Sequence, residues 1–172
     1  MGLTEVIEKA AVAEELGNKM YVEQAEKATN PLARRLLLEL ASDEGKHATW
    51  LRSLLEDVRG GQSPDYPDVA LPDIETRMKA VFLGLDATAK AQGEVEQEDV
   101  LKAAISLEKD SYRTYDDLFH AASESREKEF YDKLRRAEYE HLVALENILA
   151  YLTKTGMWFD IEESKRWNWM NI

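Results

Sequence analysis

The 172-residue sequence contains no cysteine. Disulfides, zinc–thiolate sites, iron–sulfur clusters and thiol catalysis are therefore excluded together for these residues. Glycine and proline are also scarce, with eight and four copies respectively. Because both residues interrupt helices, their scarcity favours long helices over a strand-rich fold.

Basic residues are too few to balance the acidic ones, and the formal net charge is -12. Nucleic acid and anionic membrane surfaces both need a basic face, so neither is expected as a partner. No apolar run is long enough to span a bilayer. The first residues, Met-Gly-Leu-Thr-Glu, contain neither the basic nor the apolar region of a secretory signal, so a cytoplasmic location is expected.

Apolar residues recur with a helical period in four long stretches. Between the first two stretches, Asn30 is expected to cap a helix that begins at Pro31. The four stretches are residues 4–28, 31–58, 96–122 and 125–155. The apolar face of the first stretch is expected to include Ile7, Ala10, Ala11, Leu16, Met20, Tyr21 and Ala25.

The stretches pair into two helical hairpins, at residues 4–58 and 96–155. Residues 59–95 form a long crossover that begins rich in Gly, Pro and Asp and contains a weaker helical segment at about 74–91. Residues 1–155 are therefore expected to form one all-α four-helix bundle. The Trp-rich tail, residues 156–172, could cover the bundle or pack against a second subunit.

One pattern of acidic residues and histidine occurs in both hairpins. A glutamate is followed thirty residues later by a Glu-x-x-His unit, and the two copies are offset by 94 residues. The copies are Glu14…Glu44-Gly-Lys-His47 and Glu108…Glu138-Tyr-Glu-His141. The same offset relates apolar positions such as Ala10 and Ala104, so an internal duplication of a helix pair is the simplest account.

The spacing places the three side chains of each copy at one level. Residues 29 and 123, at the two expected turns, are the midpoints between the paired glutamates, and side chains three apart share a helix face. All six lie on apolar stripes, where ionised carboxylates need compensation. A single Glu-x-x-His usually marks a solvated face or a hydrogen-bonded core pair, but the matched set favours two bound metal ions.

These residues give the chain a resemblance to a known family. The two Glu…Glu-x-x-His copies match the ligand pattern of the ferritin-like di-iron carboxylate proteins. The segments around Glu14 and Glu108, Ala13–Tyr21 and Leu107–Tyr115, resemble the rubrerythrin branch of that family. The resemblance covers both hairpins and says little about the crossover or the tail.

The resemblance implies a ligand set for two iron ions, although the carboxylate–imidazole donors also tolerate manganese or zinc. It implies Glu14 and Glu108 as ligands from the first helix of each hairpin. It further implies that Glu44 and Glu138 bridge or chelate the metals and that His47 and His141 are terminal ligands. Tyr21 and Tyr115 correspond to tyrosines that hydrogen-bond to the ligands in rubrerythrins. Their other interpretation is as ordinary core aromatics.

Two departures from the rubrerythrin pattern limit what is carried over. The four cysteines of the usual rubredoxin domain are absent, so electrons are expected from a separate donor such as a rubredoxin-like protein. The additional glutamate of rubrerythrins is replaced by Ser111, whose counterpart in the first hairpin is Gly17. These small residues could leave room beside the metals for water, dioxygen or peroxide.

The resemblance therefore implies a redox enzyme that reduces hydrogen peroxide or dioxygen. The alternatives are a ferroxidase or iron-handling protein related to ferritin, and a structural or partner-binding bundle that holds metal without turnover. Size-exclusion chromatography separates storage from the others, because storage needs a large hollow shell. A homodimer is the expected assembly.

Overall fold

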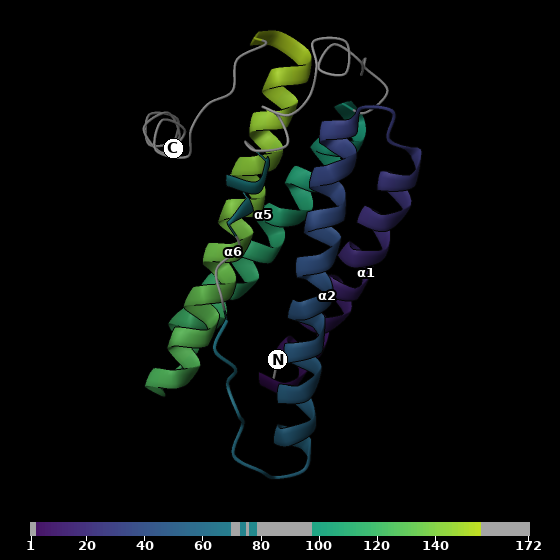
Figure 1. Ribbon diagram of the computed structural model, residues 1–172. Coiled ribbons are helices and arrows are strands. Elements are labelled where there is room, and N and C mark those ends of the chain that lie inside the picture. The colour runs from purple at the N-terminus through teal and green to yellow at the C-terminus, as the bar shows by residue number, and fades with distance from the viewer. Residues whose placement is uncertain (1–2, 70–72, 75, 79–97, 156–172) are drawn as a thin grey trace.

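The computed structural model describes residues 3–69, 73–74, 76–78 and 98–155. Within these ranges the regular structure is helical and no strand occurs, which confirms the all-α class (Figure 1). The helices are α1 (Leu3–Lys27), α2 (Pro31–Arg59), α5 (Glu98–Ala121), α6 (Ser125–Ala150) and the short π-helix η2 (Tyr151–Thr155). Most of the predicted helical segment at 74–91 and the whole Trp-rich tail lie outside the described residues.

The start of α2 follows the sequence prediction. Asn30 precedes Pro31, and its side chain accepts hydrogen bonds from the backbone N–H groups of Leu32 at 2.9 Å and Ala33 at 3.0 Å. These two bonds satisfy donors that a helix N-terminus otherwise leaves free. The helix therefore has a well-defined beginning, and the turn before it is tight.

The end of the last helix differs from the prediction of one continuous helix to residue 155. The α-helical part ends at Ala150, and the chain continues as a π-helix. The hydroxyl of Thr153 donates to the Leu149 carbonyl at 2.7 Å. That carbonyl is the regular α-helical acceptor for the Thr153 N–H, so the hydroxyl competes for it and the turn widens.

The two hairpins pack so that α1 and α5 run antiparallel. Tyr21 of α1 contacts Glu108 of α5, and Tyr115 of α5 contacts Glu14 of α1. Residue numbers therefore increase along one helix in the direction in which they decrease along the other. Since each hairpin is itself antiparallel, α2 and α5 run in the same direction. The crossover must therefore carry the chain back along the bundle, and Figure 1 shows its first part beside α6.

The buried apolar side chains form two groups, one toward each end of the bundle. The first-turn core lies near the turn between α1 and α2 and includes Ala25, Leu32, Leu36, Leu101, Leu145 and Ile148. The second-turn core lies near the turn between α5 and α6 and includes Ile7, Leu51, Leu54, Leu118, Phe130 and Leu134. In all four helices the six predicted site residues fall between these two cores.

The prediction that Leu16 lies on the apolar face of α1 is wrong, because this side chain is 62% exposed. Glu14 and Tyr21, seven residues apart, both point inward. Leu16 is two residues from Glu14, a rotation of about 200° at 3.6 residues per turn, so it points away from the core. None of the described helices is both long and apolar enough to cross a membrane.

Candidate metal centre

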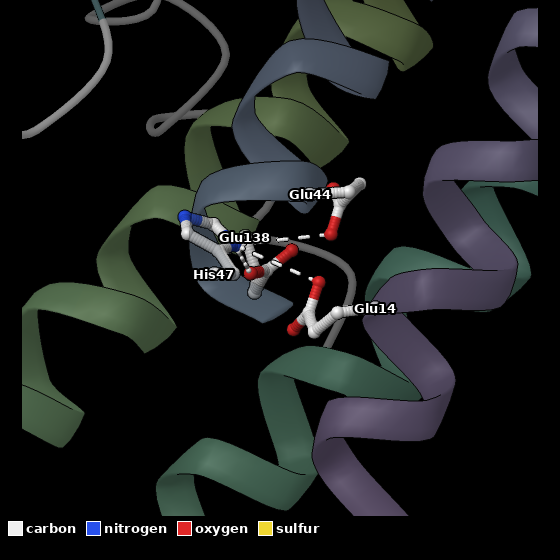
Figure 2. A group of neighbouring side chains, drawn as sticks. All are labelled: Glu14, Glu44, His47 and Glu138. Atoms are coloured by element: carbon white, nitrogen blue, oxygen red, sulfur yellow. Dashed lines mark ion pairs between the residues drawn. The ribbon is translucent and has the colours of Figure 1, made fainter. Parts of the chain in front are cut away.

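The structure brings all six predicted site residues together in one layer across the bundle. Each of the four long helices contributes, and no residue of the set is more than 3% exposed. Figure 2 shows four of them converging from three helices: Glu14 from α1, Glu44 and His47 from α2, and Glu138 from α6. The thirty-residue spacing has this effect because each hairpin turn lies midway between its paired glutamates.

The six residues form two overlapping groups of four. In each group, one atom per residue can be chosen so that all lie within 4.8 Å of one another, which is close enough to surround one ion. We name the groups position 1, with Glu14, Glu44, His47 and Glu138, and position 2, with Glu44, Glu108, Glu138 and His141. Glu44 and Glu138 belong to both, so two ions bound here would be neighbours that share two carboxylates.

Both histidines turn the same ring nitrogen toward the carboxylates. His47 Nδ1 lies 3.0 Å from Glu138 Oε1 and 3.7 Å from Glu14 Oε2. His141 Nδ1 lies 3.1 Å from Glu44 Oε1 and 3.4 Å from Glu108 Oε2. The two rings are stacked at an interplanar angle of 16°, with centroids 5.8 Å apart. The nitrogen donors therefore lie side by side, one at each position.

The inward-facing atoms fit a metal ion because they lack ordinary partners. Within the described residues, these buried atoms have no hydrogen-bond partner: Glu14 Oε2, Glu44 Oε1, His47 Nδ1, Glu138 Oε1 and Oε2, His141 Nδ1 and His141 Nε2. An unpartnered buried polar atom costs about 1–3 kcal/mol, so such a concentration needs an explanation. Divalent cations would supply the missing partner to every carboxylate oxygen and to each Nδ1.

Without metal, the outer glutamates of the two positions favour their protonated forms. Burial raises the pKa of Glu14 well above its usual value, and the charges of Glu44 and Glu138 raise it further. Burial and the charge of Glu44 likewise raise the pKa of Glu108. Two cations would reverse both effects, because a carboxylate bound to metal stays ionised.

The histidines and the shared glutamates form the charged part of the layer. Burial alone would lower the pKa of His47 and His141, but the charge of Glu138 on the first and of Glu108 on the second raises both well above the usual value. Burial and the charge of Glu138 would raise the pKa of Glu44, but its contacts with Glu14 and the two histidines lower it. Burial would also raise the pKa of Glu138, but its contacts with the two histidines lower it. Metal ions would therefore displace protons from these imidazoles and from the outer glutamates.

Two tyrosines connect the hairpins through the site. The Tyr21 hydroxyl, on the first hairpin, donates to Glu108 Oε1 on the second. The Tyr115 hydroxyl donates in the opposite direction, to Glu14 Oε1. Both rings are fully buried. Each tyrosine thus orients the outer glutamate of one position, as the resemblance implied, and the interpretation as ordinary core aromatics is incomplete.

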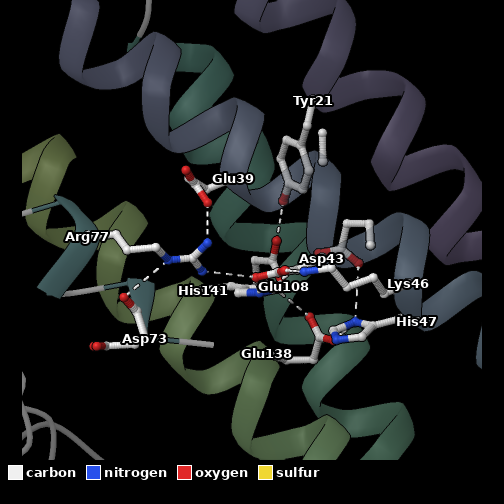
Figure 3. A network of polar contacts seen from close by, with 12 residues as sticks. Tyr21, Glu39, Asp43, Lys46, His47, Asp73, Arg77, Glu108, Glu138 and His141 are labelled. Carbon is white, nitrogen blue, oxygen red and sulfur yellow. Dashed lines mark hydrogen bonds and ion pairs between the residues drawn. The ribbon is translucent and has the colours of Figure 1, made fainter. Parts of the chain in front are cut away.

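A further acidic residue, Asp43, contacts the site and was not predicted from the sequence. Its Oδ2 lies 3.7 Å from His141 Nε2, on the side of the ring away from the glutamates, and the side chain is 6% exposed (Figure 3). The sequence feature that could have indicated Asp43 is a charged residue at a core-facing position, directly before Glu44. Its counterpart at the 94-residue offset is Ala137, so a search confined to the duplicated pattern passes over it.

A groove between α1 and α5 leads toward position 1. Its volume is about 340 Å³, and its lining includes Ala13, Glu14, Ser111 and Tyr115. Ser111 therefore lines a space that reaches the site, as expected of a small residue there. Gly17 plays a different part: a Cβ at this residue would lie 3.5 Å from Glu44 Cγ, in ordinary contact, so alanine would fit and a longer side chain would press on Glu44.

The rubrerythrin family model matches residues 5–149 of this chain. The chain belongs to the rubrerythrin family. The match contains all six residues of the candidate centre and both tyrosines. Rubrerythrins typically bind iron, and the two carboxylate–histidine groups are able to hold metal ions. No curated protein and no solved structure matches the chain.

Proposed function

We propose that this rubrerythrin-family protein is a two-iron oxidoreductase that reduces hydrogen peroxide or dioxygen. The observation that carries the proposal is the sharing of Glu44 and Glu138 between positions 1 and 2. Two ions that share carboxylates are held close enough to act on one small molecule. Separate mononuclear sites would not have this property.

A bound pair of iron ions would supply the electrons that reduce the O–O bond. The protein's own residues prepare the site for that chemistry. Tyr21 and Tyr115 hold Glu108 and Glu14 in fixed orientations through their hydroxyl groups. The apolar cores on either side exclude bulk water, so hydrogen bonds within the layer act in a medium of low polarity.

The groove between α1 and α5 is consistent with the proposal that the substrate is a small molecule. It reaches Glu14 and Tyr115, and Ser111 stands in its lining. Dioxygen or peroxide needs no large binding surface, so a narrow route to position 1 is sufficient. We propose that electrons come from a separate donor protein, since these 172 residues contain no cysteine for an iron–thiolate site.

The proposal is tested by loading the metal-free protein with ferrous iron under anaerobic conditions and mixing it rapidly with hydrogen peroxide. We expect oxidation at a defined iron stoichiometry, faster than that of the same concentration of free ferrous iron. Glu138→Ala should abolish the fast phase, because it removes a ligand from both positions. Oxidation no faster than in buffer would overturn the proposal.

Iron handling is the second candidate, favoured by the acidic composition, which attracts cations. A storage protein would continue to take up iron after both positions are filled and would assemble as a hollow shell. Size-exclusion chromatography with static light scattering, before and after aerobic iron addition, separates this candidate from the redox enzyme. A small oligomer that stops taking up iron at the stoichiometry of the two positions excludes storage.

A further inference from the structure

The surroundings of the two histidines differ, although the histidines themselves are related by the duplication. His141 faces the carboxylate of Asp43 through Nε2. His47 packs instead near the ring of Trp50, with centroids 5.6 Å apart. At the 94-residue offset, Asp43 corresponds to Ala137 and Trp50 to Ala144, neither of which can form the equivalent contact. The duplication therefore extends to the ligands but not to the groups that orient them.

Asp43 is itself held in place by two cationic side chains. Lys46, one turn further along α2, lies 2.5 Å from Asp43 Oδ1. Arg77, which comes from the crossover, lies 3.5 Å from Asp43 Oδ2, the oxygen that also faces His141. Each oxygen of the Asp43 carboxylate therefore lies near a cationic side chain, and the carboxylate has little freedom to turn away.

Arg77 is fixed as well, so the chain of contacts begins in the crossover. Its Nη1 pairs with Glu39, which also pairs with Arg35, and its Nε donates to the Asp73 carbonyl at 3.3 Å. Figure 3 shows this sequence of contacts running from Arg77 through Asp43 to His141. The neighbouring crossover residues Ile74 and Met78 are fully buried in the first-turn core, which anchors the segment that carries Arg77.

We propose that Asp43, held by Arg77, is a positioning residue for His141 and makes position 2 the tighter of the two metal positions. A carboxylate on the distal nitrogen of a histidine ligand sets the ring orientation and tautomer and increases the basicity of the donor nitrogen. Among the described residues, only His141 has a carboxylate facing its distal nitrogen, with Asp43 Oδ2 3.7 Å from Nε2. This inference rests on the proposed metal centre, and it adds that the two ions bind in a defined order.

The test uses Co²⁺, whose visible spectrum reports binding, in variants that keep one position each. His47→Ala leaves position 2, and His141→Ala leaves position 1. Adding Asp43→Ala to His47→Ala should weaken Co²⁺ binding about 10- to 100-fold, the usual effect of removing such a partner. Adding it to His141→Ala should change nothing. Equal weakening in both backgrounds, or in neither, would overturn the inference.

A matched control is available on the second hairpin. Asp116 also contacts an arginine and a histidine, with Arg135 Nη1 at 2.5 Å and His120 Nε2 at 3.6 Å. His120 is exposed and belongs to neither metal position. Asp116→Ala should therefore leave Co²⁺ binding unchanged in both backgrounds. Asp43→Asn, which keeps an oxygen acceptor for the histidine, should recover part of the loss caused by Asp43→Ala.

A second measurement keeps both histidines and so does not depend on the single-position variants. In ¹⁵N-histidine spectra recorded during addition of Zn²⁺, the His141 signals should change before those of His47 in the wild-type chain. Asp43→Ala should remove that order, and Arg77→Gln should reduce it. Simultaneous change in the wild type, or an order that persists in Asp43→Ala, contradicts the inference. A wild-type chain that binds neither ion would instead overturn the metal centre itself.

Discussion

The two hairpins carry the same six-residue pattern but support it differently. Glu14 and Glu108 have equivalent tyrosine partners, and each tyrosine comes from the opposite hairpin. The histidines lack this equivalence, because in the described part of the chain only His141 faces an aspartate. Duplication has preserved what a metal ion needs from every ligand, namely donor type and level in the bundle. It has not preserved the surrounding contacts, and those can set the two positions apart.

The largest expected effect comes from the two glutamates common to both positions. Glu44→Ala or Glu138→Ala removes a ligand from each position, so both ions should be lost. Glu14→Ala and Glu108→Ala each affect one position and should leave the other ion bound. Metal analysis after equilibrium dialysis measures the ions retained per chain. Loss of both ions in Glu14→Ala would show that the positions do not bind independently.

The pH dependence of stability should separate the metal-free protein from the metal-bound one. The pKa values of Glu14 and Glu108 are raised, so the folded chain keeps protons on these glutamates that the unfolded chain loses near pH 4.3. The pKa values of His47 and His141 are also raised, so the folded chain keeps protons on these histidines that the unfolded chain loses near pH 6.5. The stability these protons contribute is complete below the unfolded pKa values. It is lost as pH rises through the folded ones.

The metal-free chain should therefore become less stable to heat between about pH 5 and pH 8. Glu44 and Glu138 have lowered pKa values, so the stability that their ionised forms contribute is complete and constant throughout that range. It therefore does not offset the loss. Bound metal replaces the protons, so the increase in Tm on adding Zn²⁺ should grow with pH. Differential scanning calorimetry at several pH values checks this. A metal effect that is constant across the range would contradict the assigned protonation states.

Substitutions of the two tyrosines test whether the two hairpins are equivalent in the hydrogen bonds that their tyrosines donate to the outer glutamates. Tyr21→Phe removes the donor to Glu108, and Tyr115→Phe removes the donor to Glu14. Each leaves a buried carboxyl oxygen without its partner, so each should lower the free energy of unfolding of the metal-free chain by about 1–3 kcal/mol. Urea denaturation measures both. A large effect in one variant and none in the other would break the equivalence.

The smallest effect is expected at the helix starts, where the hairpins differ again. Asn30 caps α2 with two hydrogen bonds, whereas Glu124, its counterpart before α6, makes no side-chain capping bond. Asn30→Ala should lower the free energy of unfolding by about 1 kcal/mol. Glu124→Ala is the matched control and should have almost no effect in the same denaturation experiment. Similar losses in the two variants would mean that the cap does not account for the difference.

Much of the candidate centre could be predicted from the sequence, because it depends on short-range geometry. Helical period placed Glu14 and Tyr21 on one face, and the turn at residue 29 brought Glu14 level with Glu44. The misplaced Leu16 shows the limit of that reasoning. An apolar side chain is a weak sign of burial, since folded proteins leave much apolar surface exposed, whereas six ionisable residues in a repeated inward pattern are a strong one.

The sequence by itself therefore determined four long helices, the capped turn at Asn30 and the level at which six donors meet. Only the tertiary structure decided which helix faces which, and hence that each tyrosine serves the glutamate of the other hairpin. It alone placed Arg77 beside Asp43, 34 residues away, and Asp43 beside His141. Helical period carries no information about such contacts, because they depend on how separate helices and the crossover pack together.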